Sequence, residues 1–117
     1  MITFICYPKC TTCQKAKKWL DTNQIPYELR DIKENRPTLD ELAMWHERSG
    51  LPLKKFFNTS GQLYKSMELK NKLPNMNESD MLSLLSTDGM LVKRPIVVGE
   101  DAVLVGFKEA EWEAGIK

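Results

Sequence analysis

Cys10-Thr11-Thr12-Cys13 stands at the junction of a predicted strand and a predicted helix. The residues before it, Ile2-Thr3-Phe4-Ile5-Cys6, are mainly β-branched or aromatic, which is typical of a buried strand. Ala16, Trp19 and Leu20 follow at helical spacing from Cys13. A strand, a C-x-x-C pair and a helix near the N-terminus of a small α/β chain indicate a redox protein.

The two cysteines of this pair suit different roles. Cys10 is the candidate nucleophile, because its polar neighbours are typical of a solvated loop and free N–H groups at a helix N-terminus stabilise a thiolate. Cys13, one turn into the helix, is the candidate resolving thiol, which attacks a mixed disulfide formed on Cys10. A packing role against the sheet is the alternative for Cys13, and burial in the core is the alternative for Cys10. Cys6 lies within the strand, and we expect it in the core.

Zinc binding is the other chemistry that a C-x-x-C pair can serve. It needs a second pair of ligands, and the chain offers only Cys6 and its single histidine, His46, without a matching spacing. We therefore expect no metal at Cys10 and Cys13.

The bulk composition narrows the class of protein. The chain has 117 residues, with 17 Lys and Arg against 16 Asp and Glu, so its overall charge favours neither nucleic acid nor a membrane surface. No apolar run approaches transmembrane length, and Lys9 interrupts the N-terminal segment where a signal peptide would be apolar. Three cysteines, an odd number, are typical of a reduced intracellular protein, and we expect a cytoplasmic location.

The remaining patterns predict a small mixed sheet. Residues 27–32 alternate apolar and polar, which predicts a second strand and, with the first strand and helix, a parallel βαβ unit. Residues 96–98 and 102–105 are two short apolar runs around Gly99-Glu100-Asp101, which predicts an antiparallel hairpin. A short helix carrying Ala110 and Trp112 should follow.

Several short helices are predicted between these two strand pairs. Thr38 and Glu41 fit a capping box at the start of the first, and Asp88-Gly89 is the predicted end of the last. This order predicts an α/β, thioredoxin/glutaredoxin-like fold with a four-stranded mixed sheet and a helical insert over about 38–88. We expect residues 1–117 to form one thioredoxin-like domain.

Arg94-Pro95 is a second candidate for function. A proline at the start of a strand donates no ladder hydrogen bond, and a cis Arg94–Pro95 bond would place Arg94 beside the cysteines. The alternative is that Arg94 is a solvated cation in the loop after Lys93.

Three stretches of the chain together resemble the ArsC/Spx family, which comprises glutaredoxin-linked arsenate reductases and Spx transcriptional regulators. They are residues 7–16 around Cys10-Thr11-Thr12-Cys13, then 58–61, and 93–98 around Arg94-Pro95. The resemblance covers essentially the whole chain. It implies a thioredoxin-like fold, a nucleophile at Cys10, an anion-binding Arg94 and a cis-proline at Pro95.

The chain also departs from this family pattern. The arsenate reductases place two further arginines around the oxyanion, but residues 58–60 hold no arginine here and Gly106 stands near the other position. The C-x-x-C pair is closer to Spx, whereas the chain stops soon after its last predicted helix.

Two functions are therefore expected. The first is a thiol–disulfide oxidoreductase, arsenate reductase-like, that takes electrons from thioredoxin or from glutaredoxin and glutathione. The second is a redox-sensing regulator that contacts RNA polymerase, with Cys10 and Cys13 as its sensor. Neither predicts direct binding of nucleic acid or a membrane.

Overall fold

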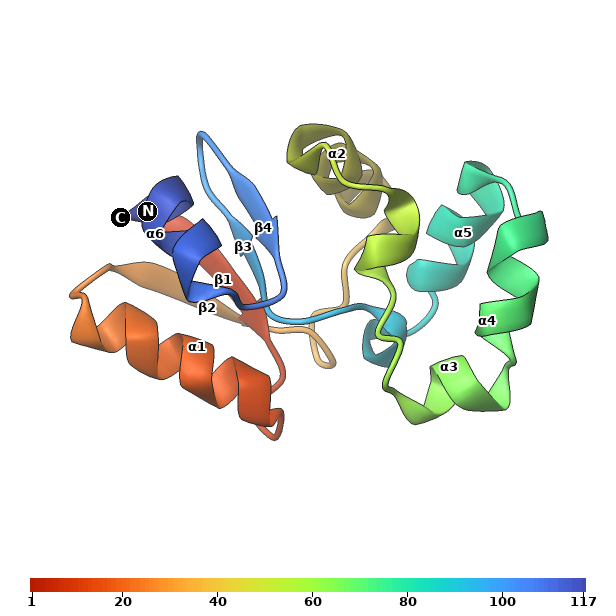
Figure 1. Ribbon diagram of the computed structural model, residues 1–117, viewed down its shortest axis with the longest axis horizontal. Coiled ribbons are helices and arrows are strands. Elements are labelled where there is room, and N and C mark those ends of the chain that lie inside the picture. Colours follow the sequence, from red (N-terminus) through yellow and green to blue (C-terminus); the bar gives the residue numbers. More distant parts are fainter.

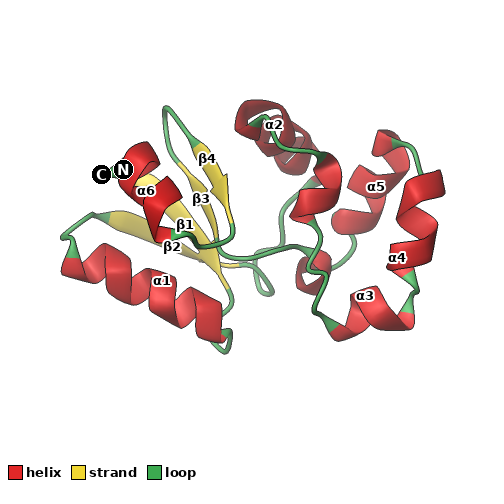
Figure 2. Ribbon diagram, in the orientation of Figure 1, coloured by secondary structure: helices red, strands yellow, loops and turns green.

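The computed structural model describes all 117 residues and is built on a four-stranded sheet (Figures 1 and 2). The strands are β1 (Ile2–Cys6), β2 (Tyr27–Asp31), β3 (Ile96–Val98) and β4 (Val103–Val105). Their order across the sheet is β2-β1-β3-β4, with β1 parallel to β2 and antiparallel to β3, and β3 antiparallel to β4. The predicted mixed thioredoxin-like sheet is confirmed.

Helices cover the sheet in two unequal groups. Helix α1 (Thr11–Thr22) and helix α6 (Glu109–Ile116) lie together at one end of the molecule in Figure 1. The helical insert follows β2 and lies at the other end. Its elements are α2 (Leu39–Ser49), η1 (Leu53–Phe56), α3 (Gln62–Ser66), α4 (Leu69–Lys72), η2 (Leu73–Asn75), α5 (Glu78–Leu85) and η3 (Gly89–Leu91). No helix is both long enough and apolar enough to span a bilayer.

The side chains of β1 alternate between two apolar cores. Phe4 and Cys6 belong to a cluster of eight buried residues that α1 and α6 complete with Trp19 and Trp112. Ile5 belongs to a cluster of fourteen buried residues that the insert supplies for the most part. This period of two is what a strand covered on both faces requires, and it explains why β1 is apolar almost throughout.

The insert begins with the predicted capping box. The Thr38 hydroxyl accepts the N–H of Glu41 at 3.1 Å, and the Glu41 carboxylate accepts the N–H of Thr38 at 3.0 Å. The same carboxylate accepts two hydrogen bonds, of 2.6 and 2.8 Å, from the guanidinium of Arg30 on β2. Arg30 also lies over the ring of Trp45 in α2. One carboxylate thus caps α2 and ties it to the sheet.

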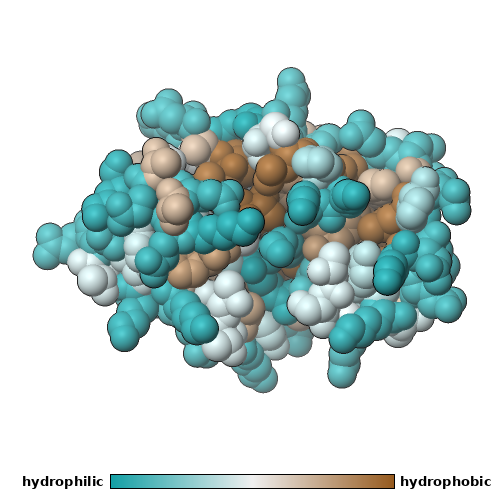
Figure 3. Space-filling view, in the orientation of Figure 1, coloured by the Kyte–Doolittle hydropathy of each residue, from teal (hydrophilic) through white to brown (hydrophobic).

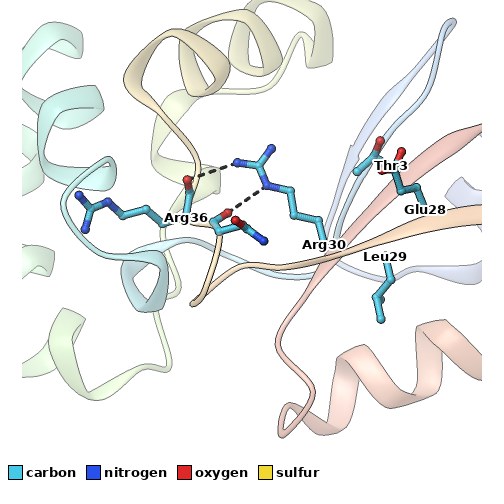
Figure 4. Close-up of a pocket in the computed structure, with 6 residues that line it drawn as sticks. Thr3, Glu28, Leu29, Arg30 and Arg36 are labelled. Atoms are coloured by element: carbon cyan, nitrogen blue, oxygen red, sulfur yellow. Dashed lines mark hydrogen bonds between the residues drawn. The ribbon is translucent and has the colours of Figure 1, made fainter.

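Arg30 also lines a polar hollow of about 370 Å³ beside β1, β2 and the loop that follows β2 (Figure 4). Its guanidinium donates to the carbonyls of Asn35 and Arg36, which hold the loop that follows the strand. No cysteine lines this hollow, so we do not place the functional site there.

Several predicted boundaries differ from the structure, among them the start of β4, which is Val103 instead of residue 102. Strand β2 ends at Asp31 instead of residue 32, because the Asp31 carboxylate accepts the N–H groups of Lys33 and Glu34 and turns the chain. Helix α5 ends at Leu85, before the predicted stop at Asp88-Gly89. The hydroxyls of Ser86 and Thr87 donate back to carbonyls in its last turn and finish the helix early.

The insert ends where it began, against the end of β2. A Cβ added to Gly89 would lie 2.0 Å from the carbonyl oxygen of Ile32 and 2.9 Å from its carbon. Both atoms belong to the backbone, so a side chain at this position forces the two segments apart. Gly89 therefore allows the last turn of the insert to pack against the residue that directly follows β2.

We predict that Gly89→Ala lowers the free energy of unfolding by roughly 1–3 kcal/mol, because the backbone at Ile32 must move. Urea unfolding measures this. Gly50→Asn is the matched control, since Gly50 has a φ of 69° that asparagine tolerates and no atom within 4 Å of its added Cβ. An equal loss in both variants would contradict the close approach.

The Arg30–Glu41 contact should make stability depend on pH in acid. Hydrogen bonds from Arg30, with a smaller contribution from the Thr38 N–H, lower the pKa of Glu41 from 4.5 to about 2. A carboxyl with a depressed pKa stabilises the fold fully above its unfolded-state pKa and loses that contribution as the pH falls toward its folded-state pKa. We predict that wild type exceeds Glu41→Gln in stability above about pH 4.5 and that the difference shrinks between there and about pH 2. Thermal melts across this range test it, and a constant difference would contradict it.

Candidate functional site

Cys10 is the N-cap residue of α1. Its N–H donates to the carbonyl of Tyr7 at 2.9 Å, and its own carbonyl accepts the N–H of Gln14 at 3.0 Å, which begins the helical ladder. No side chain caps the helix and no acidic residue lies in its first turn. The first N–H groups of α1 are therefore open to a thiolate or a bound anion at the half-exposed Cys10.

Cys13 lies one turn further on and faces inward, with only 2% of its surface exposed. The backbone N–H of Tyr7 donates to its sulfur at 3.3 Å. A hydrogen bond with the thiol of Cys6 and burial together raise the pKa of Cys13. The structure thus pairs an accessible sulfur at the helix start with a shielded one beneath it.

Cys6 is buried, as predicted, and is also a neighbour of this pair. It ends β1, is 4% exposed, and shares the apolar cluster of Cys13. Its contact with Cys13 was not predicted, although alternation along β1 puts Cys6 on the face that α1 covers. The three thiols therefore form one cluster, in which Cys10 is partly exposed and the other two are buried.

Arg94 approaches the cysteine loop through Tyr7. Its guanidinium carbon lies 5.4 Å from the centre of the Tyr7 ring, and the Arg94–Pro95 peptide bond is cis. Pro95 in turn accepts the N–H of Gly106 at 2.8 Å. No hydrogen bond joins Arg94 to a cysteine, so Tyr7 is the residue that connects the two candidate groups.

The guanidinium of Arg94 is incompletely satisfied. Its Nη1 donates to the carbonyls of Met90 and Val92, both at the long distance of 3.4 Å. Its Nε is the one buried side-chain nitrogen or oxygen in the protein without a hydrogen-bond partner. Buried donors are nearly always paired, so the unpaired Nε makes Arg94 a candidate for binding an anion.

The two positions that lack a family arginine are occupied differently. Asn58 is held in a turn, where its N–H donates to the carbonyl of Leu91 at 2.8 Å and its carbonyl accepts from Gly61. Gly106 has a φ of 79°, and an added Cβ would lie 2.9 Å from the Lys93 side chain. Arg94 is thus the arginine that the structure brings to the cysteine loop.

Fold and site together define a thiol protein of the thioredoxin-like class. The ArsC family model matches residues 6–115, and the chain belongs to that family.

Among solved structures, a protein described as a possible arsenate reductase from Streptococcus mutans UA159 is 45% identical. It superposes with a TM-score of 0.89, and the match covers 97% of each chain. Among curated proteins, the uncharacterized protein YusI of Bacillus subtilis (strain 168) is 50% identical over 96% of this chain and 95% of its own length. The global transcriptional regulator Spx of Staphylococcus saprophyticus is 29% identical over 95% of this chain and 83% of its own. The family therefore joins reductase-like proteins and regulators.

We predict that one thiol, Cys10, reacts rapidly with iodoacetamide in the folded protein, because Cys6 and Cys13 are buried. Mass spectrometry of peptides after timed alkylation locates the label. Cys10→Ser should remove the fast phase, and all three cysteines of wild type should react in denaturant. Rapid labelling of Cys13 in the folded protein would contradict the assignment.

Proposed function

We propose that the protein is a thiol–disulfide oxidoreductase of the arsenate reductase-like type. The observation that carries the proposal is the pairing of two thiols on the first turn of α1, half-exposed Cys10 and buried Cys13. The accessible sulfur of Cys10 can attack a substrate disulfide. The buried sulfur of Cys13, one turn away, can then attack the mixed disulfide on Cys10 without competing for the substrate.

In the proposed reaction, the Cys10 thiolate attacks one sulfur of a substrate disulfide. A bond forms between Cys10 and that sulfur, and the other substrate sulfur leaves as a thiolate. Cys13 loses its proton and attacks the Cys10 sulfur, which forms an intramolecular disulfide and releases the second substrate thiolate. A dithiol donor, thioredoxin or the glutaredoxin–glutathione system, then reduces the Cys10–Cys13 disulfide.

Arg94 suits an anionic substrate. Its unpaired Nε–H can donate a hydrogen bond to an oxyanion or carboxylate, and a planar guanidinium can donate two parallel hydrogen bonds. The similarity to a protein described as a possible arsenate reductase makes arsenate the first oxyanion to test. With asparagine and glycine at the two other family positions, Arg94 would carry most of the anion binding.

A turnover assay tests the proposed function. Arsenate and a glutathione-containing disulfide are each supplied with the thioredoxin system and with the glutaredoxin–glutathione system, and NADPH consumption is followed. We predict that Cys10→Ser abolishes turnover, whereas Cys13→Ser accumulates a mixed disulfide on Cys10 because the second attack is missing. Mass spectrometry of the intact chain detects this adduct. Full turnover by Cys10→Ser would exclude the proposal.

Arg94→Lys should weaken turnover of an anionic substrate. The loss of a charge-assisted hydrogen bond is expected to cost about 1.5–3 kcal/mol, which is a fall in kcat/KM of roughly one to two orders of magnitude. A neutral disulfide substrate should be affected little, and thermal melts should match wild type. An equal loss on both substrates would mean that Arg94 acts through the structure of the loop.

The second candidate function is a redox-sensing regulator that binds RNA polymerase. Similarity to Spx over nearly the whole chain favours it, and the same two thiols would serve as its sensor. Capture of an RNA polymerase subunit by the oxidised protein, and not by Cys10→Ser, would support this function. Both functions need a reducing compartment such as the cytoplasm to return the thiols to their reduced state.

A further inference from the structure

A separate hollow lies in the helical insert, among η1, α3, α4 and α5. We call it the insert groove, and it encloses about 520 Å³. The ribbons of these elements form a ring at the end of the molecule away from α1 (Figure 1). None of its lining residues belongs to the cysteine loop or to the Arg94–Pro95 segment.

Lysines form the charged part of the groove. Lys54, Lys55 and Lys70 line it, and no acidic residue does. None of the three takes part in an ion pair. Residues 54–81, the span that supplies the lining, contain five lysines and three acidic residues, Glu68, Glu78 and Asp80, none of which lines the groove. The charged side chains of the lining itself are therefore all positive.

The rest of the lining is largely apolar. Tyr64, Met76 and Met81 are each only partly buried by the fold, and they pack against the larger apolar core. Figure 3 shows apolar surface over α5 with hydrophilic side chains around it. Methionine side chains are flexible and polarisable, so they adapt to apolar partners of different shapes.

We propose that the insert groove binds an acidic, amphipathic segment of a partner protein. Carboxylates of the segment would pair with the three lysines, and an apolar side chain would enter between Tyr64 and the two methionines. This combination of lysines and apolar side chains complements a peptide that carries both carboxylates and apolar groups.

A nucleic acid is a poorer complement for the same groove. Its lysines would pair with phosphates as well as with carboxylates, but no arginine lines the groove and its apolar side chains have no partner on a phosphate backbone. The proposal does not depend on the redox chemistry, because binding at the groove involves neither cysteines nor Arg94.

The test is a binding measurement without a redox substrate. The probe is a fluorescein-labelled peptide of about twelve residues, built from Glu and Leu in the order of an amphipathic helix. We expect saturable binding by fluorescence anisotropy, weakened by added salt, in wild type and equally in Cys10→Ser. The double variant Lys54→Glu/Lys55→Glu should weaken binding by about tenfold or more.

Lys18→Glu/Lys33→Glu is the matched control, because both lysines are exposed, unpaired and outside the groove, and the change in net charge is the same. It should bind like wild type. Met81→Gln should weaken binding of the Glu/Leu peptide but not the weaker binding of a Glu/Ser peptide, which lacks the apolar side chains. Circular dichroism checks that each variant is folded.

Three results would overturn the proposal. They are an equal loss of affinity in the two double variants, no difference between the Glu/Leu and Glu/Ser peptides, and tighter binding of a single-stranded DNA of about twelve nucleotides. Since no turnover is measured, failure here leaves the oxidoreductase proposal intact, and failure of the turnover assay leaves this one intact.

Discussion

Burial of β1 on both faces is the constraint on which the rest of the structure depends. Its alternating side chains enter two separate cores, one closed by α1 and α6 and the other by the insert. A shift of one residue in its pairing with β2 would exchange the two sets of side chains. The register is therefore fixed, and with it the point at which the chain leaves the sheet toward Tyr7 and Cys10.

Tyr7, the first residue after β1, connects that fixed register to the candidate site. Its N–H holds the Cys13 sulfur, its carbonyl holds the N–H of Cys10, and its ring lies against Arg94. One residue thus links both cysteines to the segment that precedes β3. The chemistry proposed for Cys10 and Arg94 depends on backbone geometry here more than on any single charged contact.

Local sequence patterns predicted the strands, helices and turns of the protein. They did not predict the contacts between segments that are distant in the sequence. Thr38 and Glu41 predicted a capping box because their partners are three residues apart, and the hairpin around 99–101 was predicted for a similar reason. The second partner of Glu41, Arg30, lies eleven residues away, and the unpaired Nε of Arg94 depends on how residues 90–92 fold around it. The insert groove draws on residues from 54 to 81, whose convergence no local pattern indicates.

The packing of Gly89 on Ile32 has a consequence for how the family diversifies. The insert leaves the sheet and returns to it at one point. It is therefore a separate unit, added to the sheet and the helices that carry the thiols. Substitutions on its outer surface can accumulate over generations without moving Cys10 or β3. A lineage can therefore acquire a new partner through the insert while it inherits the same thiol chemistry, which fits a family that includes both reductase-like proteins and regulators.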